Sequence, residues 1–127
     1  MSMSRIMVVD DCQAVRLAVK RILAQAGYEV VTACDGEEAI EKLTEQPDLV
    51  VLDVNMPGMD GYGFCEQLNN QGKSDLPVVF LTAEESKALE LLGEQYGAYL
   101  NKPVSSDQLL QVVSTQLAAA SNRSDGV

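Results

Sequence analysis

Short runs of apolar residues alternate along this chain with segments whose apolar residues recur at helical spacing. The runs are continuous, without the apolar–polar alternation of a half-exposed strand, so they predict strands buried on both faces of a parallel sheet. We expect these strands at 5–9, 29–33, 48–52, 77–81 and 97–100. Helices are expected between Asp11 and Gly27 and at about 36–45, 62–70, 84–93 and 106–120.

The first helix illustrates how its limits are predicted. Asp11 is a suitable N-cap, because a short carboxylate can accept hydrogen bonds from the free N–H groups of a first turn. Gly27 is a suitable end, because glycine readily takes the left-handed conformation that follows a helix. The apolar stripe between them consists of Val15, Val19, Ile22, Leu23 and Ala26.

Five successive strand–helix units predict an α/β domain, with a doubly wound parallel sheet and helices on both faces. Two strand orders are common in such sheets, and five strands favour the flavodoxin-like order 2-1-3-4-5. Its ligands bind beyond the carboxyl ends of the strands, near the first and third strands. We predict this domain over residues 1–120, followed by a polar tail or the start of a linker at 121–127.

Polar residues stand where the predicted strands end. Asp10 and Asp11 follow the first strand, Asp53 the third, Thr82 the fourth and Lys102 the fifth. Each residue alone has an ordinary structural explanation, such as a helix cap, a turn or a solvated lysine. Parallel strands end at one edge of the sheet, however, so all five are expected to converge there.

Three clustered carboxylates repel one another unless a cation is present, and oxygen ligands select a hard ion. Mg²⁺ binds through one or two carboxylates and keeps several waters, with phosphate oxygens completing its coordination. The sequence therefore predicts a Mg²⁺ site that includes Asp10 and Asp11.

The amino-acid composition limits the classes of function that this chain can have. The formal net charge is −10, with 19 acidic and 9 basic residues, which disfavours direct binding to nucleic acid. The chain has no histidine, so the usual general base and His-based metal sites are absent. Its three cysteines contain no C-x-x-C pair and are interpreted as reduced, partly buried thiols. No membrane span or signal peptide is evident, so we expect a cytoplasmic protein.

Four motifs carry a family resemblance: VVDD at 8–11, LDVNMPGMDG at 52–61, LTA at 81–83 and NKP at 101–103. With them the chain resembles the receiver domain of two-component response regulators, in the form of the single-domain chemotaxis regulators. The resemblance implies a phosphoaccepting signalling module. A partner sensor histidine kinase or histidine phosphotransfer protein would transfer a phosphoryl group to Asp53, and this would switch a surface that binds a downstream protein.

The resemblance also implies roles for individual residues. Mg²⁺ would be bound by Asp11, Asp53 and the backbone carbonyl of Asn55, and through water by Asp10. Lys102 and Thr82 would contact the phosphoryl group.

A second set of residues would govern the switch and its lifetime. Thr82 would be coupled to Tyr99, although the segment between Thr82 and Lys102 is a couple of residues shorter than is usual in the family. Asn55 and Glu84 would tune hydrolysis and give a short-lived phosphoprotein. The family also leads us to expect a cis peptide bond between Lys102 and Pro103.

Two other functions compete with this interpretation. One is a phosphatase or phosphotransferase of the haloacid-dehalogenase type, but the general acid that it needs two residues after the nucleophile is Asn55 here. The other is an interaction module that works without phosphorylation. Such modules typically lack an acidic residue or the lysine, and this chain has all of them.

Overall fold

The structure, a computed structural model, describes residues 4–54, 61–73, 75–83 and 96–125. Its elements in chain order are β1 (Arg5–Val9), α1 (Gln13–Gln25), β2 (Glu29–Ala33), α2 (Gly36–Glu41), the 3-10 helix η1 (Lys42–Glu45), β3 (Leu49–Asp53), α3 (Gly61–Asn70), β4 (Val78–Thr82), β5 (Gly97–Asn101) and α5 (Ser106–Asp125). In these ranges no helix is both long enough and apolar enough to cross a bilayer.

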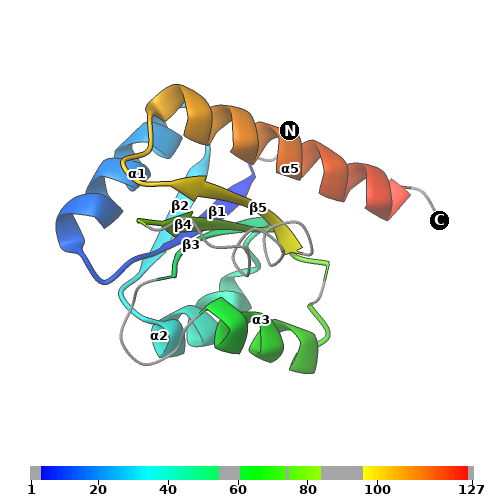
Figure 1. The fold of residues 1–127 in the computed structure, drawn as a ribbon. Coiled ribbons are helices and arrows are strands. Elements are labelled where there is room, and N and C mark those ends of the chain that lie inside the picture. The colour runs from blue at the N-terminus through cyan, green and yellow to red at the C-terminus, as the bar shows by residue number, and fades with distance from the viewer. Residues whose placement is uncertain (1–3, 55–60, 74, 84–95, 126–127) are drawn as a thin grey trace.

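The five strands form one parallel sheet in the order β2-β1-β3-β4-β5, which confirms the predicted fold class and strand order. Helices α1 and α5 cover one face of the sheet, and α2 and α3 cover the other (Figure 1). Because both faces are covered, the central strands β3 and β4 are buried along their whole length. This burial is the physical origin of their continuous apolar runs.

Alternate residues of each strand enter two separate cores. Met7, Val50 and Phe80 pack with Phe64 and Leu68 of α3 on one face. The core on the other face contains Ile6, Val8, Val51, Val79 and Leu81 of the sheet with Val19 and Leu23 of α1 and Leu109 and Val113 of α5. The two cores fix the register of the strands, since a slip of one residue would exchange their faces.

Helix boundaries differ more from the predictions than strand boundaries do. The segment predicted as one helix at 36–45 is α2 followed by η1. The last helix does not end at residue 120 but continues to Asp125, through most of the predicted polar tail. The domain boundary at 120 stays a prediction, and the helix predicted at 84–93 lies outside the described residues.

The start of α1 corrects one prediction. Its N-cap is Cys12 rather than Asp11, and the Cys12 side chain makes no capping hydrogen bond. The backbone N–H of Cys12 instead donates to Oδ1 of Asp10, at 2.9 Å. The predicted end is confirmed, because Gly27 follows the C-cap with a φ of 97°.

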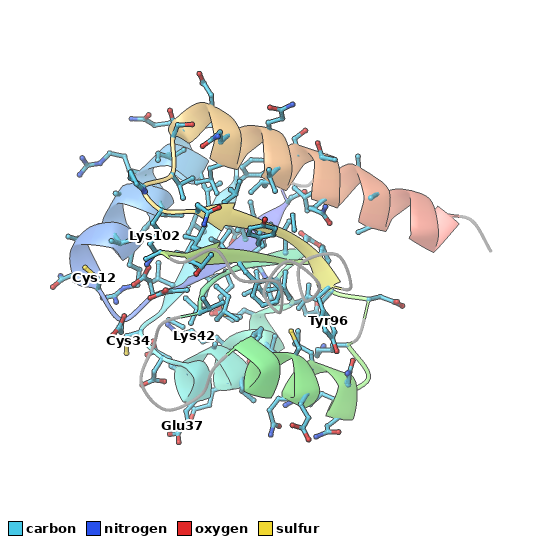
Figure 2. The ribbon with its side chains drawn as sticks, viewed as in Figure 1. Cys12, Cys34, Glu37, Lys42, Tyr96 and Lys102 are labelled. Atoms are coloured by element: carbon cyan, nitrogen blue, oxygen red, sulfur yellow. The ribbon has the colours of Figure 1, made fainter. Side chains whose placement is uncertain are left out.

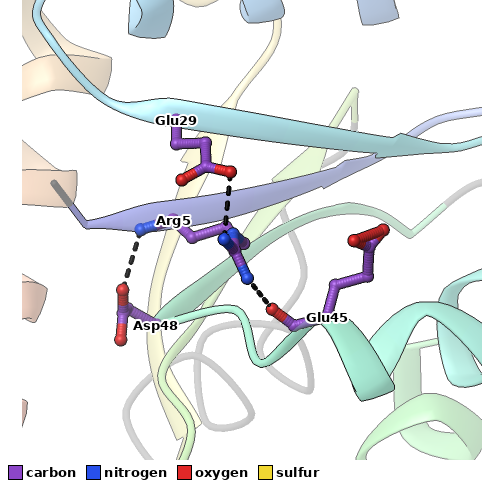
Figure 3. Close-up of polar contacts among 4 residues, drawn as sticks. All are labelled: Arg5, Glu29, Glu45 and Asp48. Atoms are coloured by element: carbon purple, nitrogen blue, oxygen red, sulfur yellow. Dashed lines mark hydrogen bonds and ion pairs between the residues drawn. The ribbon is translucent and has the colours of Figure 1, made fainter. Parts of the chain in front are cut away.

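Arg5 connects three segments at the amino edge of the sheet, where the strands begin (Figure 3). Its backbone N–H donates to Oδ2 of Asp48, at 2.7 Å. Its guanidinium donates to Oε1 of Glu29 on β2, at 3.0 Å, and to the backbone carbonyl of Glu45 in η1. Arg5 thus ties the start of β1 to β2 and to the chain that leads into β3.

Candidate functional site

The sheet order brings the predicted polar residues together at the opposite, carboxyl edge. Asp10 directly follows β1, Asp53 ends β3, Thr82 ends β4 and Lys102 directly follows β5. These four strands are consecutive neighbours in the sheet, so their ends lie side by side.

The three carboxylates are close enough to share one cation. Asp10, Asp11 and Asp53 each offer an oxygen atom, and these oxygens all lie within 4.8 Å of one another. Asp10 and Asp53 are only 1% and 4% exposed, whereas Asp11 is exposed to solvent. Like charges at this separation in a buried setting are unfavourable unless a cation compensates them.

Lys102 supplies part of that compensation. Its Nζ lies 3.1 Å from Oδ1 of Asp53 and 3.6 Å from Oδ2 of Asp10. Burial alone would lower the pKa of Lys102, but the hydrogen bond to Asp53 and the negative charges of Asp10 and Asp53 outweigh it, so the pKa is raised. Lys102 therefore remains a cation at neutral pH.

Asp10 remains incompletely satisfied. Burial raises its pKa, the backbone N–H of Cys12 lowers it, the charge of Asp53 raises it and the charge of Lys102 lowers it; the net effect is a raised pKa. Its Oδ2 atom is buried and accepts no hydrogen bond from the described residues. A buried carboxylate oxygen without a hydrogen bond, next to two further carboxylates, is the donor set that a hard divalent cation such as Mg²⁺ prefers. The residues present therefore fit the predicted metal.

Thr82 and Tyr99 lie on the same face of the sheet. Thr82 is fully buried at the end of β4. Tyr99 of β5 is the register partner of Phe80, two residues before Thr82, and packs against the core that contains Phe80. Since side chains two residues apart in a strand share a face, Tyr99 and Thr82 are diagonal neighbours across the β4–β5 pair. This placement is compatible with the predicted coupling between them.

Two predicted site residues, Asn55 and Glu84, lie outside the described residues. The expected cis peptide bond between Lys102 and Pro103 is present. The sequence reasoning missed Arg16 of α1, whose Nη1 donates to the backbone carbonyl oxygen of Asp10, at 2.7 Å. A cation six residues after Asp10, near the start of a helix, was the available signal.

The three cysteines are free. Cys12 and Cys34 are exposed and lie at the same end of the sheet as Lys102 (Figure 2), whereas Cys65 is buried. The interpretation as partly buried thiols therefore holds for Cys65 and is wrong for the other two. Burial raises the pKa of Cys65 to about 12, so this thiol stays protonated.

Comparison with known proteins gives curated relatives that are about twice as long as this chain. It is 43% identical over 121 residues to the probable transcriptional regulator ycf27 of Cyanophora paradoxa, covering 93% of this chain and 50% of that protein. It is 44% identical over 104 residues to the alkaline phosphatase synthesis transcriptional regulatory protein PhoP of Bacillus subtilis, covering 80% and 43% of the two chains. The chain thus spans about half the length of these relatives.

Solved structures of similar length share the fold. The chemotaxis protein CheY4 of Vibrio cholerae superposes with a TM-score of 0.81 at 35% identity, over 90% of this chain and 98% of that one. The signal receiver domain of a putative Luxo repressor protein from Vibrio parahaemolyticus gives a TM-score of 0.87 at 25% identity, over 97% and 96%. The family profile described as the response regulator receiver domain matches residues 6–114. With this match and these relatives, the chain belongs to the response regulator receiver domain family.

Proposed function

We propose that this receiver domain accepts a phosphoryl group on Asp53 from a phosphohistidine of a sensor histidine kinase or a histidine phosphotransfer protein. The observation that carries the proposal is the convergence of three carboxylates, with oxygens within 4.8 Å of one another, around a lysine whose Nζ lies 3.1 Å from Asp53. Asp53 ends a buried strand, so its carboxylate is held in a fixed position at the edge of the sheet.

The transfer requires a nucleophile and compensation of negative charge. A carboxylate oxygen of Asp53 forms the new P–O bond while the P–N bond to the donor imidazole breaks, and the imidazole nitrogen leaves with the bonding electron pair. Asp10, Asp11 and Asp53 would hold Mg²⁺, which would neutralise negative charge on the phosphoryl oxygens. Lys102 would contact a further phosphoryl oxygen, and the Thr82 hydroxyl would donate a hydrogen bond to another.

Phosphorylation of Asp53 would change the protein surface around Tyr99. When Thr82 turns toward the phosphoryl group, it vacates space beside Tyr99 on the shared face of the sheet, and the ring of Tyr99 can enter it. The altered surface would be recognised by a downstream protein. Two of the curated relatives are named as regulators of transcription, which is compatible with such an output in a longer protein.

The lifetime of the phosphoprotein is proposed from the resemblance alone. Asn55, two residues after the acceptor, and Glu84, two after Thr82, would admit and orient the attacking water. Replacing Asn55 by Arg should slow the decay, because the longer side chain would obstruct the approach of water. The decay rates of the two purified phosphoproteins, measured side by side, check this proposal; equal rates would refute it.

Mass spectrometry after incubation with acetyl phosphate tests the proposed function. With Mg²⁺ we expect one phosphoryl group per chain and, after borohydride reduction, a modified residue at Asp53. The same incubation with EDTA should give none. A folded protein that binds Mg²⁺ but remains unmodified would contradict the proposal and favour the interaction module that works without phosphorylation.

A further inference from the structure

Arg16 occupies an unusual position for a cation. It lies in the first turn of α1, where the helix dipole favours negative rather than positive side chains. Its guanidinium is nevertheless partly buried there, and Nη1 donates to the backbone carbonyl oxygen of Asp10, at 2.7 Å. Hydrogen bonds from a charged donor are among the strong ones in proteins. The hydrogen bond to Asp10 therefore offsets the unfavourable position of the Arg16 charge in this turn.

The carbonyl that Arg16 holds belongs to the peptide between the two adjacent carboxylates. A peptide unit is planar, so fixing its carbonyl oxygen also fixes the direction in which the chain continues to Asp11. The Asp11 carboxylate is exposed to solvent, unlike those of Asp10 and Asp53. Its distance from Asp10 and Asp53 consequently depends on the orientation of this backbone unit.

The other polar groups of Asp10 are already held by backbone atoms. Its N–H donates to the carbonyl oxygen of Ala33, at 3.2 Å, and its Oδ1 accepts from the N–H of Cys12, at 2.9 Å. The carbonyl oxygen of Asp10 depends on a side chain instead. Removing the Arg16 guanidinium would therefore release the peptide without disturbing the bonds made by the strand and the helix.

We infer that Arg16 is a positioning residue for the metal site, which holds the Asp10–Asp11 peptide so that the Asp11 carboxylate meets Asp10 and Asp53. The inference rests on the proposed function, since it concerns the Mg²⁺ that the function requires. The inference also predicts the sign of the change in Mg²⁺ affinity when Arg16 is replaced. Positive charge near the site repels Mg²⁺, so a purely electrostatic Arg16 would weaken binding and its removal would strengthen it. A positioning Arg16 has the opposite effect.

The test compares Mg²⁺ affinities of matched variants by NMR titration of backbone amides at constant ionic strength. Arg16→Met keeps the apolar stem and removes the donor, and Arg21→Met makes the same change at an exposed position of the same helix. We expect Arg16→Met to bind Mg²⁺ about tenfold more weakly, as is usual when a partner of a metal ligand is lost. Arg21→Met should bind as the wild type does or slightly more tightly, and Arg16→Lys should fall between Arg16→Met and the wild type.

The outcomes separate this inference from the proposed function. Equal or tighter binding by Arg16→Met, relative to Arg21→Met, overturns the role of Arg16 and leaves the proposed function standing. A wild type that shows no Mg²⁺-dependent shifts overturns both. The amide spectra without metal report whether each variant is folded. Should Arg16→Met not fold, Arg16→Lys decides. Weaker Mg²⁺ binding than in the wild type supports the positioning role, and wild-type affinity, with the charge kept and the guanidinium lost, overturns it.

Discussion

The two edges of the sheet both place charged side chains beside strand ends, but they satisfy these charges differently. At the amino edge opposite charges meet: the Arg5 guanidinium binds Glu29 and the Glu45 carbonyl (Figure 3), and one donor, Nε, is left without a partner among the described residues. At the carboxyl edge like charges meet, with three carboxylates around Lys102. The first arrangement stabilises the fold, whereas the second is only partly compensated by Lys102 until a further cation binds, which is typical of a functional site.

The largest difference between the edges should appear in phosphorylation. Asp53→Ala should abolish Mg²⁺-dependent labelling by acetyl phosphate, because it removes the acceptor oxygen. Asp48→Ala makes the same change at the amino edge and should leave labelling intact. Mass spectrometry of the intact proteins measures both, and substantial labelling of Asp53→Ala would refute the assignment.

The second largest difference between the two edges of the sheet should appear in the affinity for Mg²⁺. Asp11→Ala should weaken Mg²⁺ binding by about 100-fold, since losing a ligand has at least the effect of losing an outer partner of one. Thr82→Ala and Glu29→Ala should change it little, because neither removes a proposed ligand. Calorimetric or NMR titrations give the affinities. Equal losses in Asp11→Ala and Thr82→Ala would show that the division of roles is wrong.

Stability should respond at the amino edge. Arg5→Ala should lower the free energy of unfolding by about 1 kcal/mol, mainly because the Glu45 carbonyl loses its donor. The ion pair with Glu29 adds little, since 33% of the Arg5 side chain and 46% of the Glu29 side chain are exposed. Urea unfolding measures the change. A parallel fall in Mg²⁺ affinity would contradict the separation of the two edges.

The smallest expected effect is a gain in stability at the carboxyl edge. Burial raises the pKa of Asp10, so the ionised carboxylate destabilises the folded state at neutral pH. This destabilisation is relieved as the pH falls through the folded-state pKa toward the usual value of 3.8. Asp10→Asn removes the charge and keeps an acceptor for the Cys12 amide. In EDTA it should melt roughly 2 °C higher at about pH 7, and the gain should shrink at about pH 4.

Thermal melts of the Glu37→Gln variant, which removes an exposed negative charge in the first turn of α2, serve as the control for Asp10→Asn. A gain for Asp10→Asn that does not depend on pH would show that the buried charge is not its cause.

The strands and the convergence of the site could be predicted because both follow from short-range pattern and topology. Buried parallel strands need continuous apolar runs, and the observed strands begin and end within one residue of the predicted limits. Ends of neighbouring parallel strands must lie together, which placed Asp10, Asp53, Thr82 and Lys102 at one edge. The capping residue could not be predicted in the same way. Asp10 and Asp11 are adjacent acids, and only the path of the backbone decides which one receives the first N–H of the helix.

The contacts of Arg5 and Arg16 could not be predicted from the sequence, for a different reason. Arg5 reaches partners 24 and 40 residues away, and Arg16 binds a backbone carbonyl, a group that every residue possesses. Neither the hydrophobic pattern nor the composition predicts which carbonyl group a long, flexible side chain will bind. The roles of Asn55 and Glu84 remain predictions, since they rest on family resemblance alone.

The strand order has a consequence for synthesis on the ribosome, which proceeds from the amino terminus. The site draws on residues from Asp10 to Lys102, and β1 lies in the sheet between β2 and β3. Pairing of β1 with β3 can bring Asp10 and Asp53 together as soon as β3 has emerged. Lys102, their internal counterion, emerges about fifty residues later, which is several seconds at ordinary rates of translation. Until then Asp10 and Asp53 lie together without the lysine, so a soluble divalent cation could bind these carboxylates before Lys102 does.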